Sequence, residues 1–340
     1  MKEFGSDFHY LPVQHSVGKS IRDYIPNATY YACGRHALID LYKQNGWKCL
    51  WVPEYFCYSV LSDLIWEGVN LKFYFDHPLA DERETILSLP FEEGDALLRM
   101  NYFGLRSRRS NLGIKVPVIE DHTHDLIGEW ARNSDADWCI ASLRKTLPLA
   151  EGGILWSPKR EIQQFKPSQT CENEMLASKR WNAMRKKAMY LDDEIADKNE
   201  FRADMISTEE QIDRLSISKI DEETFSYLSQ FDIDRWYQLK RSNWALLKDI
   251  KLDKVSVLEP EGDGCYPFSL ILLFDSEVSR GRCRNSLINN DVYPALLWKI
   301  PSDNKHPEVK DFSNRMLSIH CDARYGVNDV KRLYDIITSC

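Results

Sequence analysis

The sequence lacks any apolar run long enough to cross a membrane, and it lacks an apolar segment near its start. A membrane-spanning helix needs about 18 or more apolar residues in a row. Residues 1–7 read MKEFGSD, whereas a secretory signal places an apolar core behind a short basic start. We therefore expect a cytoplasmic protein with no membrane partner.

The sequence also lacks paired cysteines. Its nine cysteines are odd in number and none of them forms a Cys-x-x-Cys motif. Scattered cysteines in a chain without a secretory signal are typical of reduced thiols that fill a cytosolic core. Only Cys57 becomes a candidate site residue below.

An excess of positive charge is missing as well. The chain has 44 basic and 52 acidic residues, which gives a formal net charge of −8. Surfaces that bind nucleic acids carry clustered lysine and arginine, and Arg106-Ser-Arg108-Arg109 is a short basic run of that kind. We expect this run to be a solvated loop, and we expect no nucleic-acid partner.

The residues that are abundant indicate a globular α/β protein. Hydrophobic residues make up 43% and aromatic residues 12% of the chain, which disordered chains do not show. In the first 160 residues, short apolar runs alternate with amphipathic segments, as in strand–helix–strand units of a parallel sheet. The expected helices cover residues 37–44 and 58–66. The expected strands cover residues 48–53, 71–75, 96–100, 116–119, 138–141 and 152–156.

After residue 160 the sequence pattern changes. Residues 161–250 contain long, charged helical stretches, for example 175–190 and 233–250. Two strands at 267–274 and 316–320 and a helix at 327–337 follow. We predict a large α/β domain over residues 1–160, a helical connection over 161–250, and a small C-terminal α+β domain over 251–340.

Ligands of an open parallel sheet bind in the loops after the carboxyl ends of the strands. The strand expected at 116–119 leads into Glu120-Asp121-His122-Thr-His124-Asp125, which puts an aspartate at such an end. These side chains could ligate zinc or iron, or they could satisfy one another in a polar loop. Because His122 and His124 would point to opposite sides of a continuing strand, we expect no metal site.

A lysine follows the next expected strand. Ser142 comes directly after residues 138–141, and Lys145 follows ahead of the Gly152-Gly153 turn. Desolvation at such a position lowers the pKa of a lysine and frees its amine to attack carbonyl groups. The serine hydroxyl could bind a phosphate. Taken alone, such a lysine is more often a surface residue.

Two further turns lead into helices. Gly34 opens a helix in the segment ACGRH (32–36), and the free N–H groups and dipole of a helix start attract anions. Many helices begin this way without binding an anion. After the strand at 48–53, the segment with Tyr55, Cys57 and Tyr58 could cover a planar ring or pack in the core.

In this order, these four segments resemble the fold-type-I pyridoxal-phosphate (PLP) enzymes, and in particular the DegT–StrS type of nucleotide-sugar aminotransferases. The corresponding segments are Gly34-Arg35-His36, Glu120-Asp121, Lys145 and Glu151-Gly152-Gly153, with similar stretches at 69–76, 241–244 and 316–325. The resemblance extends over nearly the whole chain. It implies the fold-type-I PLP-transferase architecture, with a mostly parallel central sheet and a smaller α+β C-terminal domain.

The resemblance implies a role in cofactor binding for several residues. Lys145 would hold PLP as an internal aldimine and later move protons, and Asp121 would keep the pyridine nitrogen protonated. His124 would contact the 3-oxygen of the ring. The expected phosphate ligands are Gly34, Arg35, His36 and Ser142. Cys57 stands where the family often has a stacking ring, with Tyr55, Tyr58 and Tyr102 as the alternatives.

Three departures from the family pattern concern the site. Arg35 replaces the usual serine or threonine, and Ser142 precedes Lys145 by three residues instead of five. The family's G-x-N-x-R segment is missing between residues 160 and 230, where charged helices are expected instead. Because that segment helps to shape the sugar site, its absence bears on which substrate is bound more than on which cofactor is bound.

The implied activity is transfer of an amino group from an amino-acid donor to a keto-sugar acceptor, which the family binds as a nucleotide-linked sugar. Arg324 would bind the carboxylate of the donor, and the active protein would be a homodimer with residues from both subunits in each site. Two alternatives stay open at this point. One is a PLP-dependent lyase or dehydratase, and the other is a non-catalytic binding or regulatory protein with the same fold.

Overall fold

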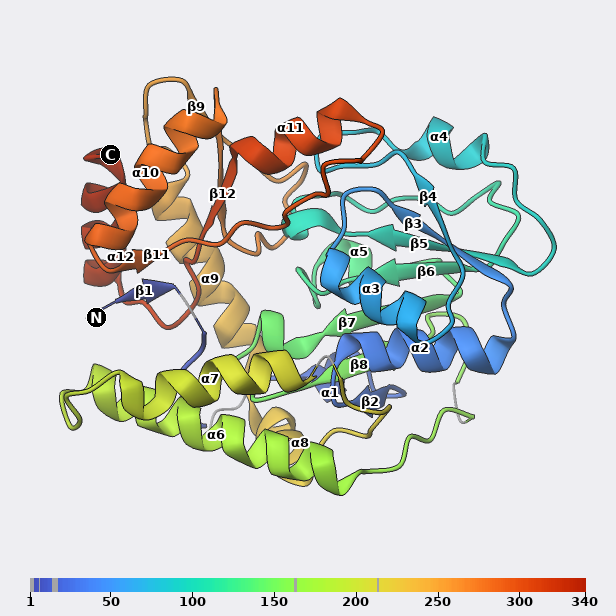
Figure 1. The fold of residues 1–340 in the computed structure, drawn as a ribbon, viewed down its shortest axis with the longest axis horizontal. Coiled ribbons are helices and arrows are strands. Elements are labelled where there is room, and N and C mark those ends of the chain that lie inside the picture. The colour runs from blue at the N-terminus through green and yellow to red at the C-terminus, as the bar shows by residue number, and fades with distance from the viewer. Residues whose placement is uncertain (1–2, 6, 14–17, 162–163, 213) are drawn as a thin grey trace.

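The computed structural model describes residues 3–5, 7–13, 18–161, 164–212 and 214–340, and a seven-stranded sheet forms its centre (Figure 1). The strands are β2 (Thr29–Tyr31), β3 (Cys49–Pro53), β4 (Leu71–Tyr74), β5 (Asp95–Met100), β6 (Val118–Asp121), β7 (Trp138–Ser142) and β8 (Gly153–Trp156). Their order is β2-β8-β7-β6-β5-β3-β4. The five strands β3 to β7 are parallel, and β8 runs antiparallel to both of its neighbours.

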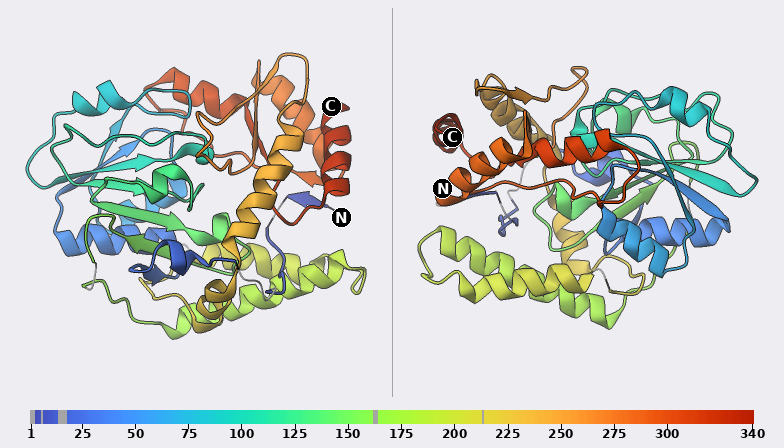
Figure 2. Two further views of the ribbon diagram at one scale, coloured as in Figure 1. Left: turned by 180° about the vertical axis from the view of Figure 1, so that it is seen from behind. Right: turned by 45° about the horizontal axis from the view of Figure 1, so that its top comes forward.

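Helices cover both faces of this sheet, which explains why its strands are continuous apolar runs. All six residues of β5 are buried. Helices α2 (Gly34–Asn45) and α3 (Tyr58–Trp66) lie on one face (Figure 1). The short helices α1 (Ile21–Tyr24) and α5 (Glu129–Arg132) lie on the opposite face, which is seen from behind in Figure 2. Gly46 ends α2, because its φ of 63° lies in the left-handed region that glycine adopts easily.

The expected strand at 116–119 is wrong by two residues, since β6 covers Val118–Asp121. Pro117 has no backbone N–H to give to a neighbouring strand, whereas the N–H of Val118 donates to Asp137 Oδ2 over 2.9 Å. The pairing then continues to Asp121, which lies opposite Met100 of β5 and Ile140 of β7. Asp121 is therefore the last residue of the strand and not the first of a loop.

The expectation of a solvated loop at the basic run is wrong for Arg106. Its side chain is 1% exposed, and it binds Asp76 through Nη2–Oδ1 at 2.6 Å and Nη1–Oδ2 at 3.0 Å. Arg108 is 42% exposed, as expected of a loop. Asp76 follows β4 and Arg106 follows β5. Both strands pair in parallel with β3, so the segments after their carboxyl ends lie at the same edge of the sheet.

Four longer helices follow the sheet in sequence. They are α6 (Cys171–Leu191), α7 (Asn199–Ile212), α8 (Glu222–Gln230) and α9 (Ile233–Leu247). Helices α6 and α7 pack side by side along one edge of the molecule (Figure 1). The hydroxyl of Thr170 caps α6 by accepting the N–H of Asn173 over 3.3 Å. A short helix, α4 (Arg83–Leu87), precedes β5.

The last part of the chain forms a small antiparallel sheet with helices on it. Its strands are β9 (Val255–Val257), β10 (Leu270–Phe274) and β12 (Met316–Ile319), and its helices are α10 (Glu277–Asn289), α11 (Pro307–Arg315) and α12 (Val327–Thr338). Near the N-terminus, β1 (Phe4–Gly5) pairs in parallel with β11 (Val292–Tyr293). The α/β fold class expected from the sequence is confirmed. No helix in the described ranges is long and apolar enough to span a bilayer.

Candidate active site

The carboxyl ends of β6 and β7 bring three of the expected site residues together. The N–H of Thr123 donates to Asp121 Oδ1 over 2.8 Å, and Thr123 Oγ1 accepts the N–H of Ser142 over 2.9 Å. A Cβ placed on Gly34 would lie 3.1 Å from the Cβ of Ser142. Asp121, Ser142 and the first turn of α2 therefore lie next to one another.

The first turn of α2 rests on the Gly152-Gly153 turn. The N–H of Gly152 donates to the carbonyl of Ala32 over 2.6 Å. A Cβ on Gly153 would lie 2.6 Å from the backbone nitrogen of Gly34 and 2.2 Å from the carbonyl carbon of Cys33. No side chain fits between these two backbones, so the close approach needs the glycine at 153. Gly152 has a φ of 132°, which residues with a side chain rarely adopt. The N–H groups and the dipole at the start of α2 are features that attract a phosphate.

The side chains of Arg35 and His36 are engaged elsewhere. Arg35 forms an ion pair with Asp63 of α3. His36 Nε2 lies 3.1 Å from the carbonyl of Leu215, and its Nδ1 accepts the N–H of Ser218 over 3.3 Å. What these two residues offer to an anion in this arrangement is their backbone N–H at the helix start.

Asp121 and His124 differ in the charge that their surroundings favour. Asp121 is 7% exposed, and burial raises the pKa of its carboxyl, although the N–H of Thr123 opposes this effect. Burial lowers the pKa of His124 to about 3, helped by the charges of Lys240 and Lys145. The imidazole is therefore neutral. Its Nδ1 accepts the N–H of Phe103 over 2.9 Å, so the proton is on Nε2, which can donate to an anionic oxygen.

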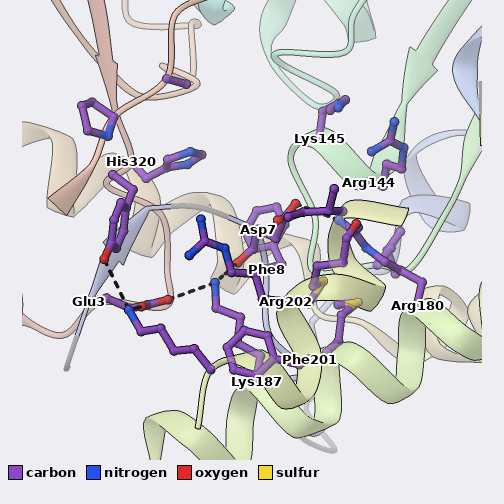
Figure 3. Close-up of a pocket in the computed structure, with 18 of the residues that line it drawn as sticks. Glu3, Asp7, Phe8, Arg144, Lys145, Arg180, Lys187, Phe201, Arg202 and His320 are labelled. Carbon is purple, nitrogen blue, oxygen red and sulfur yellow. Dashed lines mark hydrogen bonds and ion pairs between the residues drawn. The ribbon is translucent and has the colours of Figure 1, made fainter. Parts of the chain in front are cut away.

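Lys145 opens onto a cavity of about 540 Å³ between the sheet, α6, α7 and the C-terminal part (Figure 3). The lysine belongs to a short helical turn after β7, and its side chain is 46% exposed to this cavity. Protein still crowds it from several sides, so desolvation lowers its pKa, and Arg144 lowers it further. Six basic side chains line the cavity, against two acidic ones: Arg144, Lys145, Arg180, Lys187, Lys198 and Arg202, with Glu3 and Asp7.

Glu209 of α7 is the acidic partner of Lys145. Its Oε1 lies 2.9 Å from Lys145 Nζ, and its Oε2 lies 2.6 Å from Arg144 Nη1. Burial raises the pKa of Glu209, but Arg144, Lys145 and Arg180 together hold it far below its usual range. The same contact raises the pKa of Lys145 and so opposes the lowering of this pKa by desolvation.

The candidates for ring stacking are spread over different places. Cys57 caps α3 and is half-buried, with its Sγ 3.2 Å from Ser59 Oγ, and it is near enough to influence the pKa of Lys145. Tyr102 is buried, and its hydroxyl donates to the carbonyl of Tyr55 over 2.7 Å. Tyr55 is buried too, and Tyr58 stacks on Phe73. Among the four, Cys57 is the one that the structure brings near Lys145.

Arg324 is engaged with a neighbouring acid. Its Nε and Nη2 donate to the two carboxylate oxygens of Asp322 over 2.8 and 2.9 Å, and its Nη1 reaches the carbonyl of Asp7 over 3.2 Å. The charge of Arg324 holds the pKa of the buried Asp322 well below its usual range, against the effect of burial. Arg324 is not among the described residues that line the cavity.

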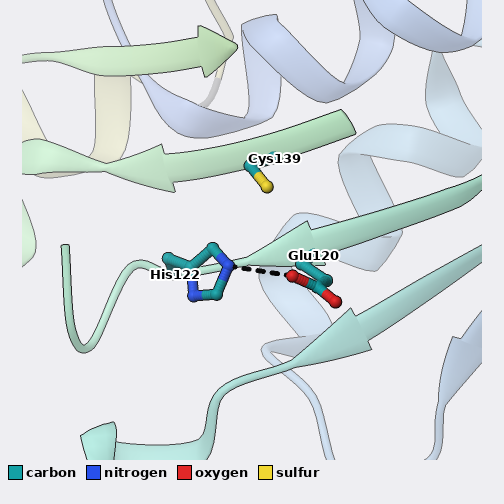
Figure 4. Close-up of side chains that lie close together, drawn as sticks. All are labelled: Glu120, His122 and Cys139. Atoms are coloured by element: carbon teal, nitrogen blue, oxygen red, sulfur yellow. Dashed lines mark hydrogen bonds and ion pairs between the residues drawn. The ribbon is translucent and has the colours of Figure 1, made fainter. Parts of the chain in front are cut away.

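The histidines and carboxylates after β6 do not gather into one group. Glu120, His122 and Cys139 place one ligand atom each within 4.8 Å of one another (Figure 4). Glu120 already accepts hydrogen bonds from His122 over 3.2 Å, from Ser134 over 2.6 Å and from Asn111 over 2.8 Å. Within the described residues, this set of polar contacts accounts for the buried carboxylate, and His124 lies outside it.

Several solved structures share this arrangement of strands and helices. The putative sugar aminotransferase Spr1654 from Streptococcus pneumoniae, in its PLP-form, matches with a TM-score of 0.66 and 11% identity over 98% of this chain and 92% of that one. PseC from Helicobacter pylori, an aminotransferase involved in the biosynthesis of pseudoaminic acid, matches with a TM-score of 0.65 and 14% identity over 99% of both chains. This chain has the fold of the sugar aminotransferases.

The likeness to this fold covers almost the whole length of each protein. The aminotransferase TlmJ from Streptoalloteichus hindustanus gives a TM-score of 0.64 and 12% identity over 94% of this chain and 88% of that one. No family model matches the sequence, and neither does any curated protein. The fold expected from the resemblance to DegT–StrS enzymes is therefore confirmed, and the comparison at these identities concerns the fold.

Four side chains near Lys145 and His124 were not expected from the sequence. Glu209 and Arg180 come from α7 and α6, where the sequence shows only charged helices. Phe268 and Trp298 pack on His124, with ring centroids 4.5 and 5.6 Å away. All four are distant from Lys145 and His124 in sequence, and no local pattern marks them.

Proposed function

We propose that this protein is a PLP-dependent aminotransferase that moves an amino group from an amino acid to a keto sugar. One observation carries the proposal. The N-terminus of α2, the buried Asp121 and the partly desolvated Lys145 belong to the same edge of the sheet. The fold of the proteins named as sugar aminotransferases supports the same activity.

The residues present fit PLP. The first turn of α2 with Ser142 would hold its phosphate, because the N–H groups and dipole of a helix start attract anions and Ser142 lies beside Gly34. Asp121 would pair with the ring nitrogen, and His124 would donate from Nε2 to the 3-oxygen. When bound, PLP supplies a ring that accepts electrons from the α-carbon of an amino acid.

The rest of the chemistry belongs to side chains of this chain. Lys145 would hold the cofactor covalently, and its amine, once released, would move a proton to or from the α-carbon of the donor. Its lowered pKa favours the neutral amine that this role needs. The excess of basic residues in the cavity supports an anionic acceptor, such as a nucleotide-linked keto sugar. We further propose a cytoplasmic homodimer, as the resemblance implies.

The decisive experiment adds PLP to the purified full-length protein. We expect the wild type to bind PLP and to absorb visible light, and glutamate to convert the bound cofactor to its pyridoxamine form. Lys145→Ala should lack the visible band, because no amine is left to hold the cofactor. A wild type that stays colourless with PLP would overturn the proposal. Cofactor that is bound but not converted by any amino acid would favour a lyase.

A further inference from the structure

The carboxylate of Glu209 forms ion pairs with Lys145 and with the two arginines beside it. The two oxygens of Glu209 are divided between Lys145 Nζ, at 2.9 Å, and Arg144 Nη1, at 2.6 Å. Arg180 Nη2 lies 3.7 Å from Oε2. The carboxylate is thus held by one lysine and two arginines, and the Glu209 side chain is 40% exposed. The three cations line the cavity, whereas Glu209 is not among the described residues that do so.

This arrangement matches the shape of an α-amino acid. In such a substrate the carboxylate and the amine are attached to the same carbon. A carboxylate bound by Arg144 therefore places the amine within a few ångströms of Lys145, because Glu209 shows that one carboxylate reaches both cations. Lys145 is the residue whose bond to the cofactor the donor amine must replace.

We propose that Glu209 stands in the place of the donor's carboxylate, and that Arg144 and Arg180 bind this carboxylate once Glu209 moves away. The inference rests on the proposed aminotransferase activity, since it assigns the carboxylate subsite of that reaction. It replaces Arg324 in this role, because the Nε and Nη2 edge of the Arg324 guanidinium binds Asp322 and its Nη1 donates to the carbonyl of Asp7.

The contacts of Arg180 and Glu209 allow a ligand carboxylate to replace that of Glu209. Arg180 also binds Asp7 over 2.7 Å, and its other contacts, to Met205 and Thr208, anchor it between α6 and α7. Arg180 therefore stays in place when Glu209 leaves. Glu209 sits on α7, and its own described partners are these cations alone.

We expect Glu209 to compete only moderately with the carboxylate of a ligand for Arg144 and Arg180. A ligand that needs Glu209 to leave binds only to the fraction of protein in which the subsite is open. The Glu209 side chain is 40% exposed, although Arg144 is 7% and Arg180 10% exposed, so water screens these pairs on the Glu209 side and we take about 1 kcal/mol as their contribution. Removing the charge of Glu209 should therefore tighten carboxylate binding by about three- to tenfold.

Calorimetric titration of the full-length protein with glutarate, without added PLP, tests this inference. Glutarate has carboxylates but no amine or ketone, so it does not react with Lys145. We expect Glu209→Gln to bind glutarate about three- to tenfold more tightly than the wild type. The matched control is Glu210→Gln, which removes the same charge from the neighbouring exposed position of α7 and should behave as the wild type. Arg144→Gln should bind glutarate more weakly.

Three results would overturn the inference: equal affinities in Glu209→Gln and Glu210→Gln, no measurable binding in any variant, or an unchanged affinity in Arg144→Gln. Neutral glutaramide should show no gain in Glu209→Gln, and an equal gain would also contradict it. Melting temperatures of all variants separate a loss of folding from a loss of binding. Because PLP is left out, a failure here and a failure to bind PLP are separate results.

Discussion

Asp121→Asn is expected to lower the rate of amino transfer by about 100- to 1,000-fold while the protein stays folded, which is the range for losing one preorganised electrostatic contact. The amide has the same size, and its oxygen can still accept the N–H of Thr123, which now reaches Oδ1 over 2.8 Å. What it loses is the negative charge that would keep the ring nitrogen of PLP protonated. Steady-state kinetics with glutamate as the donor, at saturating PLP, measures the effect.

The control for this experiment is Asp135→Asn. Asp135 lies between β6 and β7 in sequence, and its side chain is 37% exposed, so we expect a rate near that of the wild type. Asp121→Asn with bound PLP and an unchanged rate would contradict the role of Asp121. It would also leave the buried carboxyl at the end of β6 without a function in this reaction.

Asp121 should also make PLP binding dependent on pH. Because burial raises the pKa of its carboxyl, protonation begins at a higher pH than for an exposed aspartate. The affinity of the wild type for PLP should therefore fall as the pH is lowered through this raised pKa. Asp121→Asn should lack this dependence, and fluorescence titration with PLP at several pH values would show it. Parallel pH profiles in the two proteins would speak against the assignment.

Arg106→Met is expected to lower the free energy of unfolding by about 3–5 kcal/mol, the range for breaking a buried ion pair. Arg106 is 1% exposed, and it binds both oxygens of Asp76 and the carbonyls of His77 and Ala80, at 2.8 and 3.0 Å. Without it, the buried Asp76 has lost its closest positive partner and two carbonyls have lost a donor. Urea denaturation with linear extrapolation measures the change.

Arg108→Met is the matched control for this change. It removes the same charge two residues away, but Arg108 is 42% exposed and lies 3.4 Å from Asp135, so the effect should stay within about 0.5 kcal/mol. The double variant Asp76→Asn with Arg106→Met should cost less than the sum of the two single changes, since neither charge is then left alone. Equal stability of Arg106→Met and Arg108→Met would refute the ion-pair argument.

The sequence determined much of the fold because periodicity and chain breakers act locally. The apolar runs of β3, β5, β7 and β8, and the glycine that ends α2, mark these elements without any tertiary information. The order of segments around Gly34, Asp121 and Lys145 also indicated which ends of the strands meet, because the carboxyl ends of parallel strands share one edge of a sheet.

Only the tertiary structure decided which charges pair. Arg106 and Arg108 look alike in the sequence, yet one is buried against Asp76 and the other is exposed, because Asp76 follows β4, which lies one strand beyond the direct neighbour of β5. In the same way, Arg324 forms an ion pair with Asp322. Glu209, which is 64 residues from Lys145 in sequence, binds it from α7. A local pattern reports the burial and periodicity of its own segment, whereas an ion pair depends on which distant segments the packing brings together.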